Sequence, residues 1–277
     1  MKIKDILLKI KPIKHYLNGK YIHRDPFYIK GRDIDSNPFY IKGKEILNDI
    51  EYVKVQKITK KEQSKNPSRT EIINFLLLQS KNITNYLEIG VRNPDDNFNL
   101  INADKKYSVD PGVEFKSNPV DFKMTSDVFF KKLSNNEILN NEIKFDVIFI
   151  DGLHLAEQVD KDIINALKFI KDDGFIVLHD CNPPSEWHAR ENYQYIHTPA
   201  YEFWNGTTWK AFLKWRFNST VNSCCVNSDW GVGVISKNHE IGKSIEPVNL
   251  FFEFKILDEN REQYLNLINF NFFKSLF

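Results

Sequence analysis

The sequence has few cysteines, almost no net charge and no long apolar run. Three cysteines without a CxxC pair exclude a disulfide framework and a zinc site of that kind, so we expect reduced thiols and a cytoplasmic location: Cys181, Cys224 and Cys225. A net charge of +1 provides no field that would draw the protein to nucleic acid. These features argue against a disulfide-stabilised protein and against a nucleic-acid partner.

Membrane-spanning segments are also missing. No stretch approaches the ~20 apolar residues that cross a bilayer. Lysines interrupt the apolar residues of segment 1–17, which therefore does not resemble a signal peptide. That segment has the pattern of a short basic amphipathic helix. A docking or solvated arm is the favoured interpretation, and peripheral contact with a membrane surface is the alternative.

A length of 277 residues suits one large domain with additions at its ends. Residues 25–48 hold a short tandem repeat, DPFYIKGRDIDS followed by NPFYIKGKEILN, and residues 56–69 have the composition of a polar linker. We predict an N-terminal appendage over 1–67, a main domain over 68–240 and a C-terminal helical extension over 241–277.

The main domain alternates between short apolar segments and helical patterns. Thr70 is expected to cap a first helix, Gly174 to end a second over 155–171, and residues 257–270 to form a third. The apolar segments predict strands over 86–90, 106–110, 145–151, 175–180, 223–226 and 232–236. This alternation predicts an α/β fold with a Rossmann-like, mostly parallel sheet, helices on both faces and an antiparallel last strand.

Four acidic residues lie at or near the ends of predicted strands: Glu88, Asp110, Asp151 and Asp180. Ligands of open α/β sheets bind outside the carboxyl ends of the strands, so we expect these side chains along one edge. Asp110 follows Gly90 at the spacing that brings an acid to ribose hydroxyls. The GxGxxG pattern of pyrophosphate sites is missing. A phosphate-free, cationic nucleoside such as S-adenosylmethionine fits these residues.

These motifs resemble class I methyltransferases, specifically methyltransferase family 24. That branch is similar to macrocin-type sugar O-methyltransferases and, more distantly, to catechol O-methyltransferase. The resemblance covers residues 68–236. It rests on YLEIGVRNPDDNF (86–98), YSVDPG (107–112), TSDVFF (125–130), FDVIFIDGLHLAEQVDKDIINAL (145–167), IVLHDCNPP (176–184), WNGTTWKAF (204–212) and DWGVGVI (229–235).

The resemblance implies a set of cofactor contacts for S-adenosylmethionine. Glu88 and Gly90 would hold the methionine end, and Asp110 the ribose. Ser126 and Asp127 would lie beside the adenine. Arg92 and Asp151 complete the expected cofactor side.

Candidate catalytic residues lie at two strand ends and in the loop after one of these strands. Asp151 and Asp180 occupy positions where metal-dependent relatives place magnesium ligands, but Cys181 stands where those relatives usually have Asp or Asn. Cysteine is a poor ligand for magnesium, so metal dependence stays open. His154 is the candidate general base for a hydroxyl acceptor, and a helix-capping role is the alternative. His179 is expected to be buried.

The acceptor side is predicted in the segment before the last two strands. Trp204, Thr207 and Lys210 combine aromatic faces with polar groups, which suits a sugar-like acceptor, while a packed lid is the alternative. We therefore predict an O-methyltransferase that modifies a sugar, glycan or related small molecule. Oligomeric state is left open, with a homo-oligomer among the alternatives.

Two rival functions remain at this point. A NAD-dependent oxidoreductase would share the fold, but the second and third glycines of its fingerprint are missing. A non-catalytic binding protein would use the lysine-rich N-terminus as an interaction arm. Hydrolases with a GxSxG motif are excluded, because the sequence has none.

Overall fold

The computed structural model describes residue 45 and residues 48–114, 117, 119–194 and 198–277. The chain divides into two compact units, 1–54 and 55–277, and the account below concerns the second. The predicted helix over 1–17 and nearly all of the repeat at 25–48 lie outside the described residues. Among the described residues, no helix is long and apolar enough to cross a membrane.

The described residues of the second unit form a seven-stranded sheet in the order β2-β1-β3-β4-β6-β5-β7. Its strands are β1 (Asn85–Ile89), β2 (Lys105–Val109), β3 (Phe145–Ile150), β4 (Ile170–Leu178), β5 (Asn222–Val226), β6 (Val232–Ser236) and β7 (Leu267–Ile268). β6 pairs antiparallel with both of its neighbours, and the other pairings are parallel. The predicted α/β class is therefore confirmed, with β6 as the antiparallel strand.

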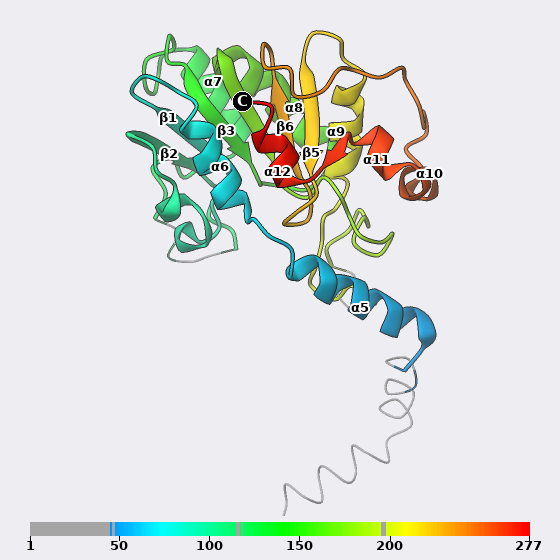
Figure 1. The fold of residues 1–277 in the computed structure, drawn as a ribbon. Helices are drawn as coiled ribbons and strands as arrows, with labels where there is room; N and C mark the ends of the chain where they lie inside the picture. Colours follow the sequence, from blue (N-terminus) through cyan, green and yellow to red (C-terminus); the bar gives the residue numbers. More distant parts are fainter. Residues whose placement is uncertain (1–44, 46–47, 115–116, 118, 195–197) are drawn as a thin grey trace, which may run out of the picture. The chain divides into compact units, whose positions relative to one another are not determined.

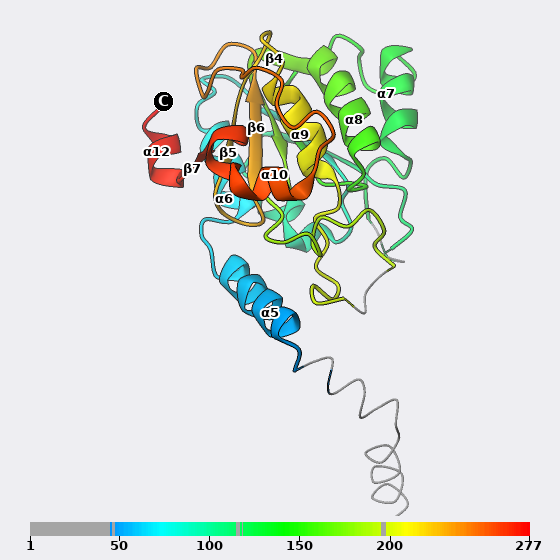
Figure 2. The same ribbon diagram turned by 90° about the vertical axis from the view of Figure 1, so that its right-hand side faces the viewer.

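Helices cover both faces of the sheet (Figures 1 and 2). On one face, α6 (Arg69–Leu77) and α12 (Phe270–Lys274) pack on Tyr86, Val147 and Phe149. On the other, α7 (Ser126–Ser134), α8 (Ala156–Phe169) and α9 (Thr208–Arg216) pack on the alternate residues of the same strands. This two-sided burial explains the nearly continuous apolar sequence of the central strands.

The connection between β1 and β2 departs from the predicted strand–helix alternation. It carries two short 3₁₀ helices, η2 (Pro94–Asp96) and η3 (Phe98–Leu100), in place of an α-helix. Pro94 and the capping side chain of Asn93 favour a tight turn here, and only 15 residues separate the two strands.

Several predicted boundaries were wrong. The predicted linker over 56–69 is largely helical, because α5 (Ile50–Gln63) runs into it and buries Val55, Thr59 and Glu62. Gly174 does not end a helix: α8 ends at Phe169 and Gly174 lies inside β4. A Cβ at Gly174 would lie 2.9 Å from the Asp146 carbonyl oxygen, so close packing explains this glycine.

The C-terminal segment also differs from the single helix predicted over 257–270. It forms α10 (Phe254–Glu259), α11 (Arg261–Tyr264), the short strand β7 and then α12. At the other end of the domain, Ser68 and not Thr70 caps α6. Its side chain accepts from the Glu71 backbone N–H while Glu71 reaches back to the Ser68 N–H, a reciprocal capping box.

This cap generates a stability prediction. Ser68→Ala removes the acceptor for the Glu71 N–H and should lower the free energy of unfolding by about 1 kcal/mol, measured by urea denaturation. Ser64→Ala is the matched control, because its exposed hydroxyl only donates to the Lys61 carbonyl at the end of α5. Equal losses in the two variants would contradict the capping role of Ser68.

Candidate active site

The carboxyl ends of three neighbouring strands bring the predicted acidic residues together. β1 pairs with β3 and β3 with β4, so Ile89, Ile150 and Leu178 lie side by side at the strand ends. Asp151 and Asp180 follow at this edge, and Glu88 lies just before it. The turn between β5 and β6 adds Asp229, which contacts the histidine that precedes Asp180. We call Glu88, Asp151, Asp180 and Asp229 the acidic edge.

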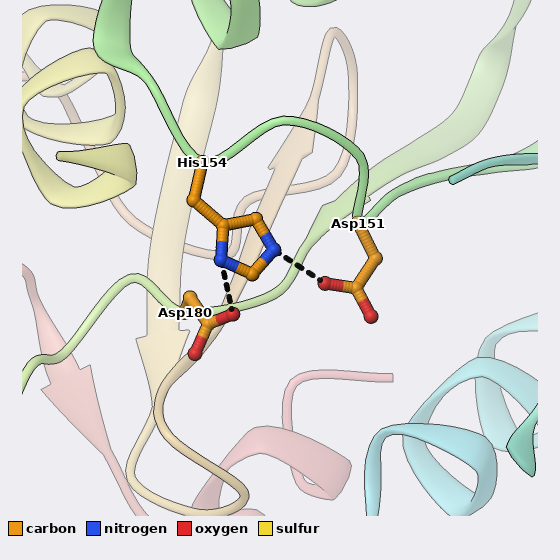
Figure 3. Close-up of side chains that lie close together, drawn as sticks. All are labelled: Asp151, His154 and Asp180. Atoms are coloured by element: carbon orange, nitrogen blue, oxygen red, sulfur yellow. Dashed lines mark ion pairs between the residues drawn. The ribbon is translucent and has the colours of Figure 1, made fainter. Parts of the chain in front are cut away.

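His154 lies between two members of the acidic edge (Figure 3). Its Nε2 is 3.3 Å from Asp151 Oδ1, and its Nδ1 is 3.3 Å from Asp180 Oδ2. Nδ1 also lies 2.9 Å from the Trp204 carbonyl oxygen, and the two rings stack with centroids 5.1 Å apart. The prediction that Asp151, His154 and Asp180 form one group is therefore consistent with the geometry.

The electrostatic environment of His154 follows from these contacts. Burial by itself lowers the pKa of the imidazole, but the charge of Asp180 and the hydrogen bond to Asp151 together raise it to about 9. Burial likewise opposes ionisation of Asp151, yet the charge of His179 and hydrogen bonds from both histidines hold the pKa of this carboxyl well below its usual range. Direct contacts among Asp151, Asp180, His154 and His179 thus determine the protonation of Asp151 and His154.

The sequence analysis assigned no role at this edge to Asp229 or Arg69. Asp229 Oδ1 lies 3.2 Å from His179 Nε2, and Asp229 Oδ2 accepts from the Arg69 backbone N–H at 2.6 Å. The Nδ1 of His179 lies 3.1 Å from Asp180 Oδ2 and 3.2 Å from Asp151 Oδ1. His179 is buried as predicted, at 8% exposed. The one available signal was the position of Asp229 in a turn between two strands.

Asp229 depends on an unusual backbone. Asp229 and Trp230 have φ values of 43° and 64°, and Gly231 follows at 89°. These left-handed conformations disfavour side chains, so the surrounding contacts must fix them. The Cys181 and Asn182 backbone N–H groups donate to the carbonyls of Gly231 and Trp230 and tie the turn to the end of β4.

Glu88 is the most deeply buried acid of the edge, at 3% exposed. Its Oε2 accepts from the Tyr86 hydroxyl at 2.6 Å and from the Asn97 amide at 2.9 Å. Burial raises the pKa of Glu88 to about 7, although these two hydrogen bonds oppose the shift. Thr70, the residue predicted to cap α6, instead donates to the Asn97 Oδ1 and steadies this network.

Gly90 follows β1 and packs closely against the ends of the two neighbouring strands, β2 and β3. It has a φ of +91°, and a Cβ here would lie 2.3 Å from the Asp151 carbonyl oxygen. Its N–H donates to the Val109 carbonyl, which brings the following residue, Asp110, beside it. The Asp110 Oδ1 accepts from the Gly112 N–H at 2.5 Å, an arrangement that orders the loop after β2.

The remaining cofactor-side predictions differ in their placement. Ser126 and Asp127 begin α7, and the Gln158 amide donates to both at 3.2 Å, so α8 holds them in place. Arg92 lies at the surface: its side chain is 67% exposed and pairs with Asp96. The structure therefore gathers Glu88, Gly90, Asp110 and Asp151 but leaves Arg92 at the surface.

The predicted acceptor residues lie on one segment. Trp204 stacks on His154, as described, and its indole donates to the Arg190 carbonyl at 2.6 Å. Thr207 is buried, and its hydroxyl accepts from the Ala156 N–H at 2.8 Å at the start of α8. Lys210 pairs with Glu191. Trp204 thus contacts the candidate base directly, whereas Thr207 has a structural contact.

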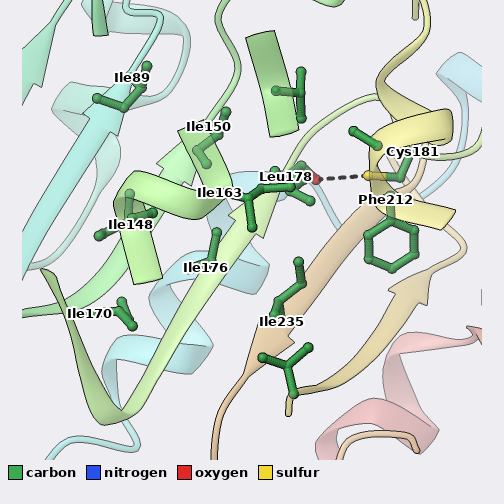
Figure 4. Close-up of a cluster of buried hydrophobic side chains, with 14 of the residues drawn as sticks. Ile89, Ile148, Ile150, Ile163, Ile170, Ile176, Leu178, Cys181, Phe212 and Ile235 are labelled. Carbon is green, nitrogen blue, oxygen red and sulfur yellow. Dashed lines mark hydrogen bonds between the residues drawn. The ribbon is translucent and has the colours of Figure 1, made fainter. Parts of the chain in front are cut away.

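Cys181 does not face the acidic edge. It is fully buried in the apolar core, beside Leu178 and near Phe212 and Ile235 (Figure 4). Burial raises the pKa of its thiol well above the usual value, so it stays protonated. Asn182, the next residue, accepts from Arg261 at 2.6 Å. Neither side chain stands in for the metal ligand that the resemblance places after Asp180.

Comparison with known families gives one match within the sheet-forming part of the chain. Residues 84–181, which run from β1 through the end of β4, match the family described as "Methyltransferase domain". Over these residues the chain is similar to that family, in agreement with the resemblance of its sequence motifs to class I methyltransferases. No curated protein matches the sequence.

Several solved methyltransferase structures are among those that match this chain. An O-methyltransferase from Bacillus cereus is 18% identical, with 68% of this chain and 89% of that chain covered and a TM-score of 0.39. The O-methyltransferase TomG from Streptomyces achromogenes is 12% identical, with 68% and 90% covered and a TM-score of 0.37. MycE from the mycinamycin biosynthetic pathway is 11% identical, with 74% and 59% covered and a TM-score of 0.39.

The buried carboxyl of Glu88 predicts a pH-dependent stability. Its pKa in the folded state is about 7, against an ordinary value of 4.5, so the folded protein retains a proton that the unfolded chain loses. Stability should therefore fall as pH rises from 4.5 to 7, by about 3 kcal/mol for this group. Glu88→Gln keeps an acceptor without the charge, and should be more stable than the wild type at pH 8.

Urea denaturation at pH 5 and pH 8 measures this effect. The advantage of Glu88→Gln should be large at pH 8 and small at pH 5, whereas the exposed control Glu142→Gln should show no such difference. An equal change at both pH values would show that Glu88 does not carry a buried charge.

Proposed function

We propose that this protein is an S-adenosylmethionine-dependent O-methyltransferase that transfers a methyl group to a hydroxyl of a sugar, glycan or related small molecule. The observation that carries the proposal is the placement of His154 between Asp151 and Asp180, at the strand ends that also present Gly90. A base and a nucleoside site at one sheet edge are the two parts that methyl transfer to a hydroxyl needs.

The residues present fit the cofactor. Asp110 lies at the end of β2 beside Gly90, a position suited to ribose hydroxyls, and buried Glu88 favours a cationic amino-acid group. Ser126 and Asp127 offer polar groups for the adenine. When bound, S-adenosylmethionine supplies an electrophilic methyl on a sulfonium, and the protein's own task is to align the acceptor and remove its proton.

His154 is the residue that removes this proton. The Trp204 carbonyl can only accept a hydrogen bond, so it fixes the proton of a neutral imidazole on Nδ1. The lone pair is then on Nε2, where an acceptor hydroxyl would replace Asp151 as the hydrogen-bond partner. The raised pKa keeps the ring protonated at neutral pH, so His154 acts as the base only in those molecules in which the ring has lost its proton and is neutral. Asp151 and Asp180 then stabilise the imidazolium that forms.

The same residues fit a divalent cation. Asp151, His154 and Asp180 each offer one ligand atom, and these atoms lie within 4.8 Å of one another. Two carboxylates suit magnesium, and the imidazole extends the range to manganese or iron. Such an ion would be held by Asp151 and Asp180 and would lower the pKa of an acceptor hydroxyl. If the lone pair of His154 were also a ligand, it would not be available to remove the acceptor's proton.

Aromatic side chains support a sugar-like acceptor. The Tyr193 ring lies 5.5 Å from that of Trp204, which in turn stacks on His154. Tyr193 and nearby Trp187 are 47% and 41% exposed. Exposed aromatic faces with polar rims suit the C–H faces and hydroxyls of a sugar ring.

The cytoplasmic location, the absence of nucleic-acid binding and the formation of a homo-oligomer stay predictions.

Cofactor binding tests the proposal through Asp110. Asp110→Ala removes an acceptor for ribose hydroxyls and should weaken S-adenosylhomocysteine binding about 10- to 100-fold, as measured by calorimetry. Asp172→Ala, at an exposed position in β4, is the matched control and should bind normally. Unchanged affinity in Asp110→Ala, or tighter binding of NAD than of S-adenosylhomocysteine by the wild type, would contradict the assignment.

Turnover tests the base. His154→Asn should slow methyl transfer from radiolabelled S-adenosylmethionine to a panel of mono- and oligosaccharides about 10²- to 10⁴-fold. Its affinity for S-adenosylhomocysteine should stay within about twofold, because proton removal concerns the acceptor side. His239→Asn is the control, since His239 lies far away beside Phe175. Full turnover by His154→Asn would end the base assignment.

A further inference from the structure

Arg69 is a partly buried cation that the proposed mechanism does not use. It is the first residue of α6 and lies outside the region that matches the methyltransferase-domain family. Its Nη1 lies 3.4 Å from Asp229 Oδ2, and its Nε lies 3.8 Å from Asp151 Oδ2. Although Nε is buried, it donates a hydrogen bond to no described group. A buried guanidinium N–H without an acceptor is costly unless a ligand uses it.

The position of this N–H relates it to the nucleoside site. Arg69 faces the carboxylate of Asp151, and the backbone carbonyl of Asp151 packs against Gly90. Gly90 and Glu88 form the end of β1, where the amino-acid part of the cofactor is expected. Arg69 and Gly90 are therefore both close to Asp151, Arg69 to its side chain and Gly90 to its backbone.

Charge balance indicates which part of the cofactor Arg69 would contact. Among the described residues, the ion pairs of Asp151, Asp180 and Asp229 are made with His154, His179 and Arg69. Arg69 is the one member of this set that carries a permanent positive charge. The amino-acid portion of S-adenosylmethionine is a zwitterion: acidic groups suit its ammonium, but its carboxylate requires a cation.

We propose that Arg69 binds the α-carboxylate of the cofactor through its Nε–H, and that Asp229 positions the guanidinium for this contact. The inference rests on the proposed function, because it assigns a contact within the same cofactor site. Asp229 holds both the backbone N–H and the Nη1 of Arg69, so the remaining Nε edge is presented toward Asp151 and the strand ends.

Two probes that differ only at the amino-acid end test this contact. S-adenosylhomocysteine carries the carboxylate, and 5′-methylthioadenosine lacks the whole amino-acid portion. By calorimetry, Arg69→Gln should weaken S-adenosylhomocysteine binding about 10- to 100-fold and leave 5′-methylthioadenosine binding within about twofold. Arg69→Lys should recover part of the loss, because it restores the charge without the planar fork.

Further variants separate binding from folding. Asp229→Asn keeps Arg69 but removes the charge that positions its guanidinium. It should weaken the binding of S-adenosylhomocysteine by a smaller factor than Arg69→Gln does, and leave the binding of 5′-methylthioadenosine unchanged. This variant provides the test if Arg69→Gln is poorly folded. Arg261→Gln is the matched control, because Arg261 is similarly buried and pairs with Asp258 on α10. Its binding of both probes should be unchanged.

The outcomes distinguish the two proposals. If the wild type binds S-adenosylhomocysteine and Arg69→Gln binds it equally well, the Arg69 assignment is overturned while the proposed function stands. Equal losses for both probes also overturn it, since they would indicate a structural effect. If the wild type binds neither probe, the proposed function fails and the Arg69 contact fails with it.

Discussion

The concentration of carboxylates at one edge of the sheet is the constraint on which the rest of this site depends. Parallel strands place their carboxyl ends together, so Glu88, Asp151 and Asp180 come within reach of one another whatever their distance in sequence. Buried like charges are tolerated only when cations and donors neutralise them. His154, His179 and Arg69 do this, and their positions therefore follow from those of the acids.

The need to neutralise these carboxylates also explains features outside β1, β3 and β4. The left-handed turn at Asp229 places a carboxylate against His179 and Arg69, and the capped start of α6 presents Arg69 to it. Asn205 donates to Asp180 Oδ1 at 2.8 Å, which leaves Asp180 Oδ2 directed at His154. Residues from α6, the β5–β6 turn and the segment before α9 thus converge on a centre that β3 and β4 provide.

Much of this arrangement was predictable, because the pattern of apolar residues identifies the strands and the position of each acid at a strand end places it at the sheet edge. The apolar segments at Tyr86 and Phe145 could only be strands buried on both faces, and acids at their ends then had to share an edge. The strand boundaries of β1, β2 and β3 agree with prediction to one residue. His154 was identifiable from its place in the loop after β3.

The predictions that were wrong share a physical cause: contacts between residues distant in sequence determine the structure at those positions. Gly174 looks like a helix stop, but the space beside the Asp146 carbonyl, which sequence does not reveal, requires it inside β4. Asp229 and Arg69 contact each other although they are 160 positions apart in the sequence, so neither role could be read from local pattern.

A crystal structure with S-adenosylhomocysteine tests the central claim most directly. The account predicts the ligand at the ends of β1 and β2, with its ribose at Asp110 and its amino-acid end between Gly90 and Arg69, whereas a ligand bound away from the acidic edge would contradict it.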